Sequence, residues 1–278
     1  MFSSPEEFRS YVKLYYGEGT WLKFVRDLRR PLVGISLERL VQEFHCQGLD
    51  HRTSFFSKEI TRVFDKYLLP LFQENNSKGN PTKILSLPCS SGQEVYSLAT
   101  LAWDQGFRDF AVEGRDLCDH LVKRAKKREY WAEQAKKDLL EPFLEKKYFR
   151  IQKRKRKRDR SPNLIISPDI VERCNFEQQD ILLEEVPSGY NAIFCLNLLM
   201  HLNQKGKELA LSNLADNLCP GDLLFLGDSY QVNRGYVWRG GNLQRDRMTD
   251  YNQFVGELEK RSEGKFRKIG ESNVYRRV

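Results

Sequence analysis

From Lys83 onward, short apolar runs alternate with stretches whose apolar residues recur at helical spacing. This order is typical of βαβ units built around a mostly parallel sheet. The runs expected to be strands are 83–87, 110–113, 191–196 and 223–226, and the helices expected between them are 93–103, 119–133 and 204–218. Residues 266–269 and 273–277 are expected to close the sheet as a hairpin. The sequence therefore predicts an α/β fold with a doubly wound, Rossmann-like sheet.

The first 80 residues lack strand-like alternation and place apolar residues at helical spacing, which predicts an N-terminal helical domain over 1–80. Helix-start signals stand at 3–7, which reads Ser-Ser-Pro-Glu-Glu, and at Ser57, ahead of Lys58 and Glu59. Turn-forming residues fill 74–81, so we place a domain boundary there and a second domain over 81–278. Within it the pattern lapses between about 139 and 170, which indicates a small insert or a mobile loop.

The chain has six cysteines and no CxxC pair, a pattern typical of reduced buried thiols and not of a disulfide framework or a zinc site. The one local group, His45, Cys46 and His51, supplies too few ligands for a structural metal. No apolar run approaches the roughly 20 residues that span a bilayer, and the N-terminus lacks a signal-peptide pattern. A cytoplasmic protein without membrane insertion is therefore expected.

The formal net charge is +8, but seven basic residues and one acid lie in the run from Lys153 to Arg160, which leaves only +2 for the rest of the chain. Such a run can contact nucleic-acid phosphates, act as a localisation signal, dock an acidic protein surface or remain a solvated loop. No aromatic residue interrupts it, which disfavours binding of single-stranded RNA.

The loop after the first expected strand is the first place to look for a ligand, because parallel sheets bind ligands at the carboxyl ends of their strands. Residues 88–92 are small or turn-forming, and Gly92 stands where free N–H groups begin the next helix. The loop has no GxGxxG pattern, so a dinucleotide would lack its tight glycine turn. A ligand without phosphate fits better. S-adenosylmethionine is such a ligand, and Glu94 is the expected partner of its ammonium group.

Two carboxylates follow later expected strands. Asp116 lies about 20 residues beyond the glycine loop, where nucleotide-binding α/β folds hold ribose hydroxyls. The competing interpretation is that Asp116 caps the following helix. Asp180 stands where a third strand is expected to end and is a candidate acceptor for an adenine amino group, with a turn or cap role as its alternative.

Several segments, in order along the chain, resemble the chemotaxis-receptor methyltransferases of the CheR type. The segment LSLPCSSGQEVYSLA at 85–99 is similar to the first motif of that family, roughly a strand followed by GCSTGEEPYSLA. Further similar segments are TSFF at 53–56, RDLCD at 115–119, YF at 148–149, and the stretches 171–183, 192–202 and 218–229. The resemblance runs from about Thr53 to Ser229, whereas the first 50 residues match poorly.

The resemblance implies methyl transfer from S-adenosylmethionine to glutamate carboxylates of a protein in chemotaxis signal transduction, leaving S-adenosylhomocysteine. An ionised carboxylate needs no general base, so positioning and desolvation would carry most of the rate. By position, the resemblance implies a set of cofactor-binding residues: Thr53, Pro88, Ser90, Glu94, Asp116, Asp180, Ile181, Cys195 and Leu196.

Some positions depart from the family pattern. Ser57 and Leu196 replace arginines, Pro88 replaces the first-motif glycine, and Tyr230 replaces a glutamate. The lost arginines imply either another substrate or lost activity.

His201 stands in place of the family tyrosine near the transferred methyl group. It is a candidate catalytic residue, either as a polar group beside the methyl or, when neutral, as a proton acceptor. The alternative interpretation is that His201 has no catalytic role and lies at the surface or at the start of a helix. Asn197 is retained and either orients the substrate or caps the strand end.

Three hypotheses follow from the sequence. The first is a CheR-type protein-glutamate methyltransferase, whose basic insert would suit an acidic, receptor-like protein partner because the insert contacts the receptor in the family. The second is an RNA methyltransferase guided by the basic run. The third is a degenerate module that binds S-adenosylmethionine and signals without catalysis.

Overall fold

The computed structural model describes residues 2–28, 35–47, 55–128, 130–132, 137–152, 162–226, 236–239, 242–245, 254–269 and 273–278. The chain forms two compact units. The central unit is His51–Gln179, and the discontinuous unit combines Met1–Asp50 with Asp180–Val278. Each unit is described by itself. The predicted domain boundary after residue 80 stays a prediction.

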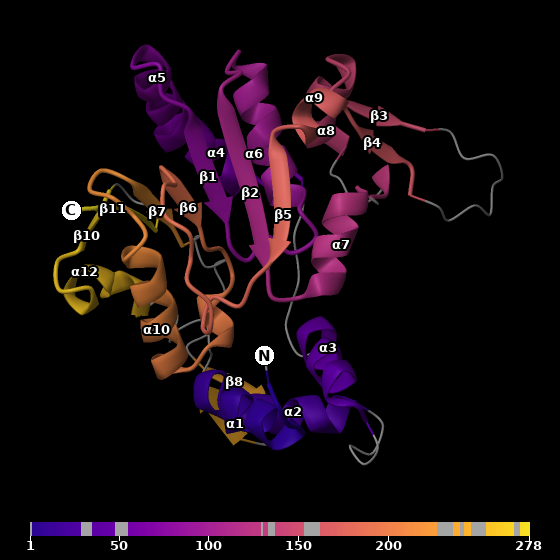
Figure 1. The fold of residues 1–278 in the computed structure, drawn as a ribbon, viewed down its shortest axis with the longest axis vertical. Helices are drawn as coiled ribbons and strands as arrows, with labels where there is room; N and C mark the ends of the chain where they lie inside the picture. The colour runs from indigo at the N-terminus through magenta and orange to yellow at the C-terminus, as the bar shows by residue number, and fades with distance from the viewer. Residues whose placement is uncertain are drawn as a thin grey trace. The chain divides into compact units, whose positions relative to one another are not determined.

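The central unit contains a parallel sheet of β1 (Thr82–Ser86), β2 (Phe110–Asp116) and β5 (Cys174–Gln178), with β2 in the middle (Figure 1). The helical segments α4 (Lys58–Val63), η1 (Phe64–Leu68) and α5 (Leu69–Ser77) precede β1. Helix α6 (Gln93–Asp104) connects β1 to β2 and is buried from Gln93 to Ala102. A helix that follows a buried strand and leads into a parallel neighbour is the βαβ unit that the sequence predicts.

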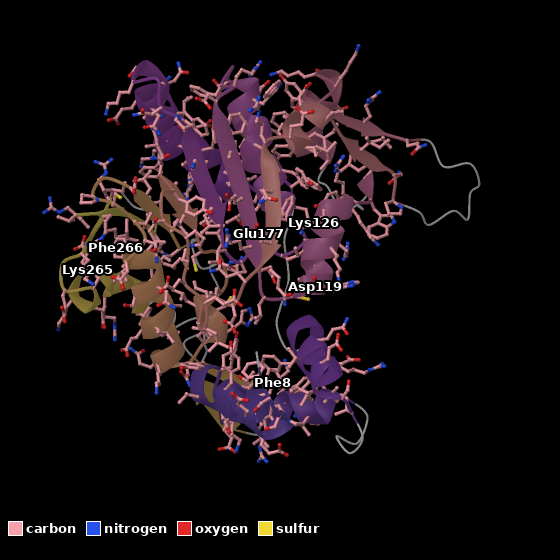
Figure 2. The ribbon with its side chains drawn as sticks, viewed as in Figure 1. Phe8, Asp119, Lys126, Glu177, Lys265 and Phe266 are labelled. Atoms are coloured by element: carbon pink, nitrogen blue, oxygen red, sulfur yellow. The ribbon has the colours of Figure 1, made fainter. Side chains whose placement is uncertain are left out.

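Helix α7 (Asp119–Lys127) follows β2 and exposes charged side chains such as Lys126 (Figure 2). The expectation that this helix continues to residue 133 is wrong. Arg128 adopts a left-handed conformation at φ 58°, and its N–H donates back to the last turn. A left-handed residue at this position ends a helix. Tyr130 then forms a β-bridge with Leu164.

The segment expected as an insert holds α8 (Lys137–Glu145), β3 (Phe149–Ile151), β4 (Leu164–Ile166) and α9 (Pro168–Val171). Strands β3 and β4 pair antiparallel, with Phe149 opposite Ile166. The buried Phe149 ring packs against Phe55 and Phe56 at centroid distances of 5.5 and 5.6 Å. The described part of this segment is therefore folded, and the basic run 153–160 lies outside the described residues.

The discontinuous unit begins with α1 (Pro5–Tyr15), α2 (Glu18–Asp27) and α3 (Leu37–Gln47). Its strands β6 (Ala192–Phe194) and β7 (Leu223–Phe225) are parallel and flank η3 (Leu199–His201) and α10 (Gln204–Ala215). The remaining elements are β8 (Tyr236–Arg239), β9 (Asn242–Arg245), α12 (Leu258–Arg261), β10 (Phe266–Lys268) and β11 (Val274–Arg277). Strand β11 pairs antiparallel with β10 and β7, which confirms the predicted hairpin. Parallel strands alternating with helices confirm the α/β class.

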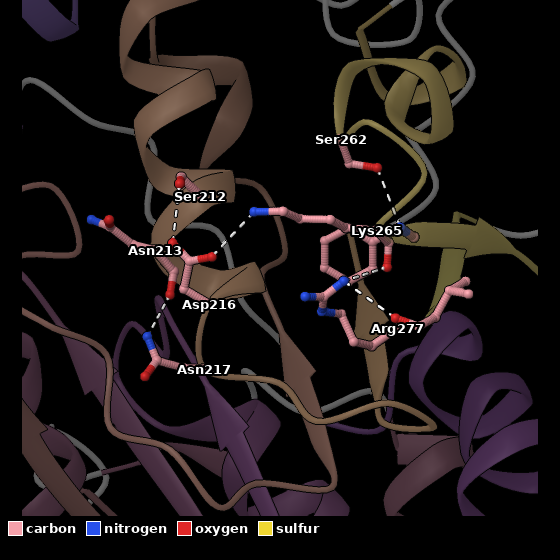
Figure 3. Close-up of polar contacts among 9 residues, drawn as sticks. Ser212, Asn213, Asp216, Asn217, Ser262, Lys265 and Arg277 are labelled. Carbon is pink, nitrogen blue, oxygen red and sulfur yellow. Dashed lines mark hydrogen bonds and ion pairs between the residues drawn. The ribbon is translucent and has the colours of Figure 1, made fainter.

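Polar contacts tie the end of α10 to the closing hairpin (Figure 3). The Asp216 carboxylate accepts hydrogen bonds from Ser212 Oγ at 3.3 Å and from Lys265 Nζ at 3.4 Å. Arg277 Nη1 donates to the Lys265 carbonyl at 3.0 Å. These groups are exposed, so each contact adds little to stability.

Helix α1 is anchored at both ends. Ser4 is its N-cap and accepts from Glu7 N, as the sequence predicts, and Ser57 caps α4 in the same way. At its other end, Asn203 N donates to the Tyr15 carbonyl and Asn203 Nδ2 to the Leu14 carbonyl, both at 2.8 Å. A Cβ at Gly206 would lie 2.5 Å from the Tyr15 oxygen, so only glycine allows this approach. The N-cap residue of α10 therefore satisfies carbonyls that would otherwise end α1 without partners.

The described cysteines Cys89, Cys118, Cys174, Cys195 and Cys219 are all free. Cys219 is exposed, so the prediction of buried thiols is wrong at that position because it lies in the turn before β7. Within the described ranges, no helix is long and apolar enough to cross a membrane, and no cluster of ligating side chains could hold a metal ion. The side chains of His45 and Cys46, and all of His51, lie outside these ranges.

Candidate functional site

In the central unit, the loop after β1 is joined to the end of β2 through the Asp116 carboxylate. Ser90 N donates to Asp116 Oδ2 at 2.7 Å, and Cys118 N donates to Asp116 Oδ1 at 2.8 Å. The N-cap of α7 is Cys118, so the alternative that Asp116 caps this helix is wrong. Asp116 is only 3% exposed, and its carboxylate sets the position of the loop.

The turn into α6 depends on Gly92. Its φ of +88° is left-handed, and a Cβ there would lie 2.8 Å from Ala125 Cβ and 2.9 Å from Phe176 Cε1. The Tyr130 hydroxyl donates to the neighbouring Ser91 carbonyl. The loop is therefore fixed by Asp116, by the close packing around Gly92 and by Tyr130. These contacts also fix the direction of the first N–H groups of α6.

The Ser90 hydroxyl marks this loop as a place for a ligand. Its Oγ is buried and has no hydrogen-bond partner among the described residues, and Ser90 adopts a φ of 51°. A buried polar atom without a partner costs free energy, and a bound polar molecule would recover it. The loop therefore fits a ligand with hydrogen-bonding groups. Pro88, the first residue of the loop, is half-buried.

Glu94 lies in the first turn of α6 and is 7% exposed. Ser86 Oγ donates to its Oε1 at 2.8 Å. Burial raises the pKa of Glu94 to about 7, although the hydrogen bond from Ser86 opposes the shift. A cation placed beside this carboxyl would favour its ionised form, so the group is matched to an ammonium.

We expect Glu94 to make the stability of the ligand-free protein depend on pH. The folded protein keeps this proton up to about pH 7, whereas the unfolded chain loses it near 4.5. The contribution of Glu94 to the free energy of unfolding therefore falls as pH rises from 4.5 to 7 and is constant above. Relative to Glu94→Gln, the free energy of unfolding of the wild type should fall by about 3 kcal/mol over that window, measured by urea unfolding. Glu145→Gln, which removes an exposed carboxyl, is the control. If the free energies of unfolding of wild type and Glu94→Gln differ by the same amount at every pH between 4.5 and 7, the expectation is wrong.

In the discontinuous unit, the Asp180 carboxylate accepts hydrogen bonds from backbone and side-chain donors. Leu182 N donates to Oδ1 at 2.9 Å, and the Tyr11 hydroxyl donates to Oδ2 at 2.7 Å. Burial raises the pKa of Asp180, and the hydrogen bond from Tyr11 opposes the shift. Asp180 thus has the predicted turn role and also a partner in α1 that sequence reasoning missed. No local pattern could have indicated Tyr11, which is 169 positions away.

Ile181 is 5% exposed, and its carbonyl accepts from Asn213 Nδ2 at 2.6 Å. After β6, Cys195 is fully buried and its N–H donates to the Phe225 carbonyl at 2.8 Å, while Leu196 is half-buried. Asn197 is exposed and left-handed at φ 64°, a conformation that asparagine tolerates better than most residues.

His201 ends η3 and is half-buried, so it is not at the start of α10, whose N-cap is Asn203. Its backbone N–H donates to the Leu198 carbonyl at 2.9 Å. Thr53 and Tyr230 lie outside the described residues. Ser57, at the position of a lost family arginine, caps α4.

Comparisons with known proteins identify the chain's family. Residues 51–239 match the family model described as CheR methyltransferase, SAM binding domain. A chemotaxis protein methyltransferase of Listeria innocua serovar 6a is 30% identical over 215 residues, covering 77% of this chain and 75% of the relative. One of Listeria monocytogenes is 27% identical over 219 residues, with the same coverage of 77% and 75%. The structure of a magnesium protoporphyrin IX methyltransferase from Synechocystis, with bound S-adenosylmethionine, aligns with a TM-score of 0.39 and 14% identity, covering 89% of this chain and 100% of that one. The family match spans more than half of the chain, so this protein belongs to the CheR family of methyltransferases and uses S-adenosylmethionine as its methyl donor.

Proposed function

We propose that this methyltransferase esterifies glutamate side chains of a receptor-like protein. The observation that carries the proposal is the family match over residues 51–239, and the relatives named as chemotaxis protein methyltransferases support it. The products would be a glutamate methyl ester and S-adenosylhomocysteine. The acceptor carboxylate is ionised near neutral pH and attacks without a general base, so the protein has to position it and exclude water.

Bound S-adenosylmethionine supplies a methyl group activated by its sulfonium sulfur. In the central unit, we assign Glu94 to its ammonium, Asp116 to its ribose hydroxyls and Ser90 to a polar group beside them. The buried acceptors at Glu94 and Asp116 and the unpartnered Ser90 hydroxyl support these assignments. The full set that we propose for the cofactor is Thr53, Pro88, Ser90, Glu94, Asp116, Asp180, Ile181, Cys195 and Leu196.

We assign Asp180 to the adenine amino group and propose that Asn197 and His201 act at the methyl-transfer point. Asn197 would orient the acceptor carboxylate, since its side chain is exposed at the end of β6. The half-buried His201 would supply the polar surface that tyrosine supplies in relatives.

Labelling with S-adenosylmethionine that carries a tritiated methyl group tests the substrate class. Incubation with an extract of the source cells should label a protein band, and mild base should release the label as volatile methanol, because carboxyl esters are base-labile. Asp116→Ala should show no labelling. Base-stable label on RNA would favour the nucleic-acid substrate and overturn the proposal. Binding of S-adenosylhomocysteine without any transfer would indicate a signalling module instead.

Three other sequence-based expectations remain part of this proposal. They are a cytoplasmic location, a helical domain over 1–80, and an acidic, receptor-like surface as the partner of the basic run 153–160. Deletion of that run should lower the rate of protein labelling while leaving S-adenosylhomocysteine affinity unchanged.

A further inference from the structure

A buried hydrogen bond joins the N-terminal helix to a proposed cofactor residue. Tyr11, on α1, donates from its hydroxyl to Asp180 Oδ2 at 2.7 Å, and both residues belong to the discontinuous unit. Tyr11 is 5% exposed and Asp180 7%. Helix α1 lies outside the family match, which begins at residue 51. The contact therefore extends the proposed cofactor site into a part of the chain that the comparison does not cover.

The position of the Tyr11 hydroxyl is fixed by its surroundings. Its ring contacts Phe2, Tyr15 and Tyr16 at centroid distances of 4.9, 5.4 and 5.9 Å. Phe8, labelled on the same helix in Figure 2, stacks at 6.2 Å. The hydrogen bonds of Asn203 hold the end of α1 as described above. These ring contacts hold the Tyr11 oxygen beside the Asp180 carboxylate.

Tyr11 acts on the oxygen of Asp180 that its local turn does not hold. Leu182 N donates to Oδ1, so the bond from Tyr11 to Oδ2 fixes the carboxylate from its other oxygen. A carboxylate accepts about four hydrogen bonds, so capacity for a ligand remains after those from Tyr11, Leu182 and Leu183. Burial disfavours the ionised carboxylate, and a donor such as the Tyr11 hydroxyl offsets that cost.

We propose that Tyr11 is a positioning residue of the cofactor site, whose hydroxyl holds the Asp180 carboxylate in the orientation that accepts from the adenine amino group. The inference rests on the proposed role of Asp180. It makes α1 a determinant of base specificity, because a fixed acceptor distinguishes an amino group from a carbonyl at the same ring position.

The test compares two ligands in one preparation of the full chain. S-adenosylhomocysteine presents the amino group, and S-inosylhomocysteine presents a carbonyl in its place. The wild type should bind S-adenosylhomocysteine with a Kd more than about tenfold lower than that for S-inosylhomocysteine. In the second complex the inosine carbonyl would face the buried Asp180 carboxylate, and neither group can donate a hydrogen bond to the other. In Tyr11→Phe, which keeps the ring, the preference should fall about fivefold. The ratio of two affinities does not depend on how much of the preparation is folded.

Tyr15→Phe is the matched control, since it removes a hydroxyl from the same helix and its ring also belongs to the aromatic cluster. It should leave the preference at the wild-type value. An unchanged preference in Tyr11→Phe would overturn the proposal, as would an equal fall in Tyr15→Phe.

Asp180→Asn separates failure of this inference from failure of the role assigned to Asp180. The amide can donate to a carbonyl, so the preference should collapse or reverse, and adding Tyr11→Phe should then change it no further. If Asp180→Asn keeps the wild-type preference, the assignment of Asp180 to adenine is wrong. If Asp180→Asn abolishes the preference and Tyr11→Phe does not affect it, only the positioning role is wrong.

Discussion

Asp116→Ala should raise the Kd for S-adenosylhomocysteine by at least about a hundredfold, measured by titration calorimetry. The substitution removes the acceptor proposed for the ribose hydroxyls, and hydrogen bonds to an ionised group are each worth about 1.5–3 kcal/mol. It also leaves the N–H groups of Ser90 and Cys118 without their carboxylate acceptor. The free energy of unfolding should therefore fall by about 3 kcal/mol as well.

Two further variants separate the loss of affinity for S-adenosylhomocysteine from the loss of stability. Asp116→Asn keeps the size of the side chain and one acceptor oxygen, so its affinity should lie between those of the wild type and the alanine variant. Asp119→Ala removes a surface carboxylate that is paired with Lys123 in the first turn of α7 (Figure 2) and should change neither quantity by more than about 1 kcal/mol. Wild-type affinity in a folded Asp116→Ala protein would remove Asp116 from the cofactor site.

Gly92→Ala should destabilise the protein by about 2–5 kcal/mol. The left-handed conformation costs a residue with a Cβ about 1–2 kcal/mol, and overpacking a filled site costs about 1–3 kcal/mol more. The new methyl would meet Ala125 and Phe176, both within 3 Å. A backbone shift at Gly92 would also displace Ser90, two residues earlier in the same loop. The affinity for S-adenosylhomocysteine should therefore fall together with the free energy of unfolding.

Gly106→Ala is the matched control for Gly92→Ala. Gly106 has the same φ of +88°, but a Cβ there meets nothing within 4 Å. The free energy of unfolding of Gly106→Ala should fall only by the cost of the left-handed conformation, about 1–2 kcal/mol, as measured by urea unfolding. Equal losses in the two variants would show that the contacts of Gly92 with Ala125 and Phe176 contribute nothing.

The architecture could be predicted from the sequence because buried parallel strands are continuous apolar runs with distinct boundaries. Residues 83–87 and 223–226 predicted β1 and β7 to within one residue at each end. The same logic placed Gly92 at the start of the helix that follows the first strand, and Asp116 at the end of the second strand. Strands β3 and β4 could not be found in this way, because only Phe149 of β3 is buried and Ile165 of β4 is exposed, so neither strand is a continuous buried run.

Other features depend on contacts that no local pattern contains. The early end of α7 depends on a left-handed arginine at residue 128, a position where glycine would have been the sequence signal. The Tyr11 partner of Asp180 comes from a helix 169 positions earlier, and the capping of α1 by Asn203 joins segments 189 positions apart. Sequence could suggest that Asp180 is a site residue, but only the fold shows which group orients its carboxylate.

The capping of α1 by Asn203 also has a consequence for synthesis on the ribosome. Helix α1 is translated before Asn203, the residue that satisfies its last carbonyls from 189 positions further along the chain. An isolated helix of 11 residues is marginal in water, so α1 stays largely unfolded while the rest of the chain is made. The contiguous His51–Gln179 segment is translated before Asn203. Translation therefore completes the central unit before the residue that caps α1 is made, and the aromatic residues of α1 must be kept from aggregating until Asn203 appears.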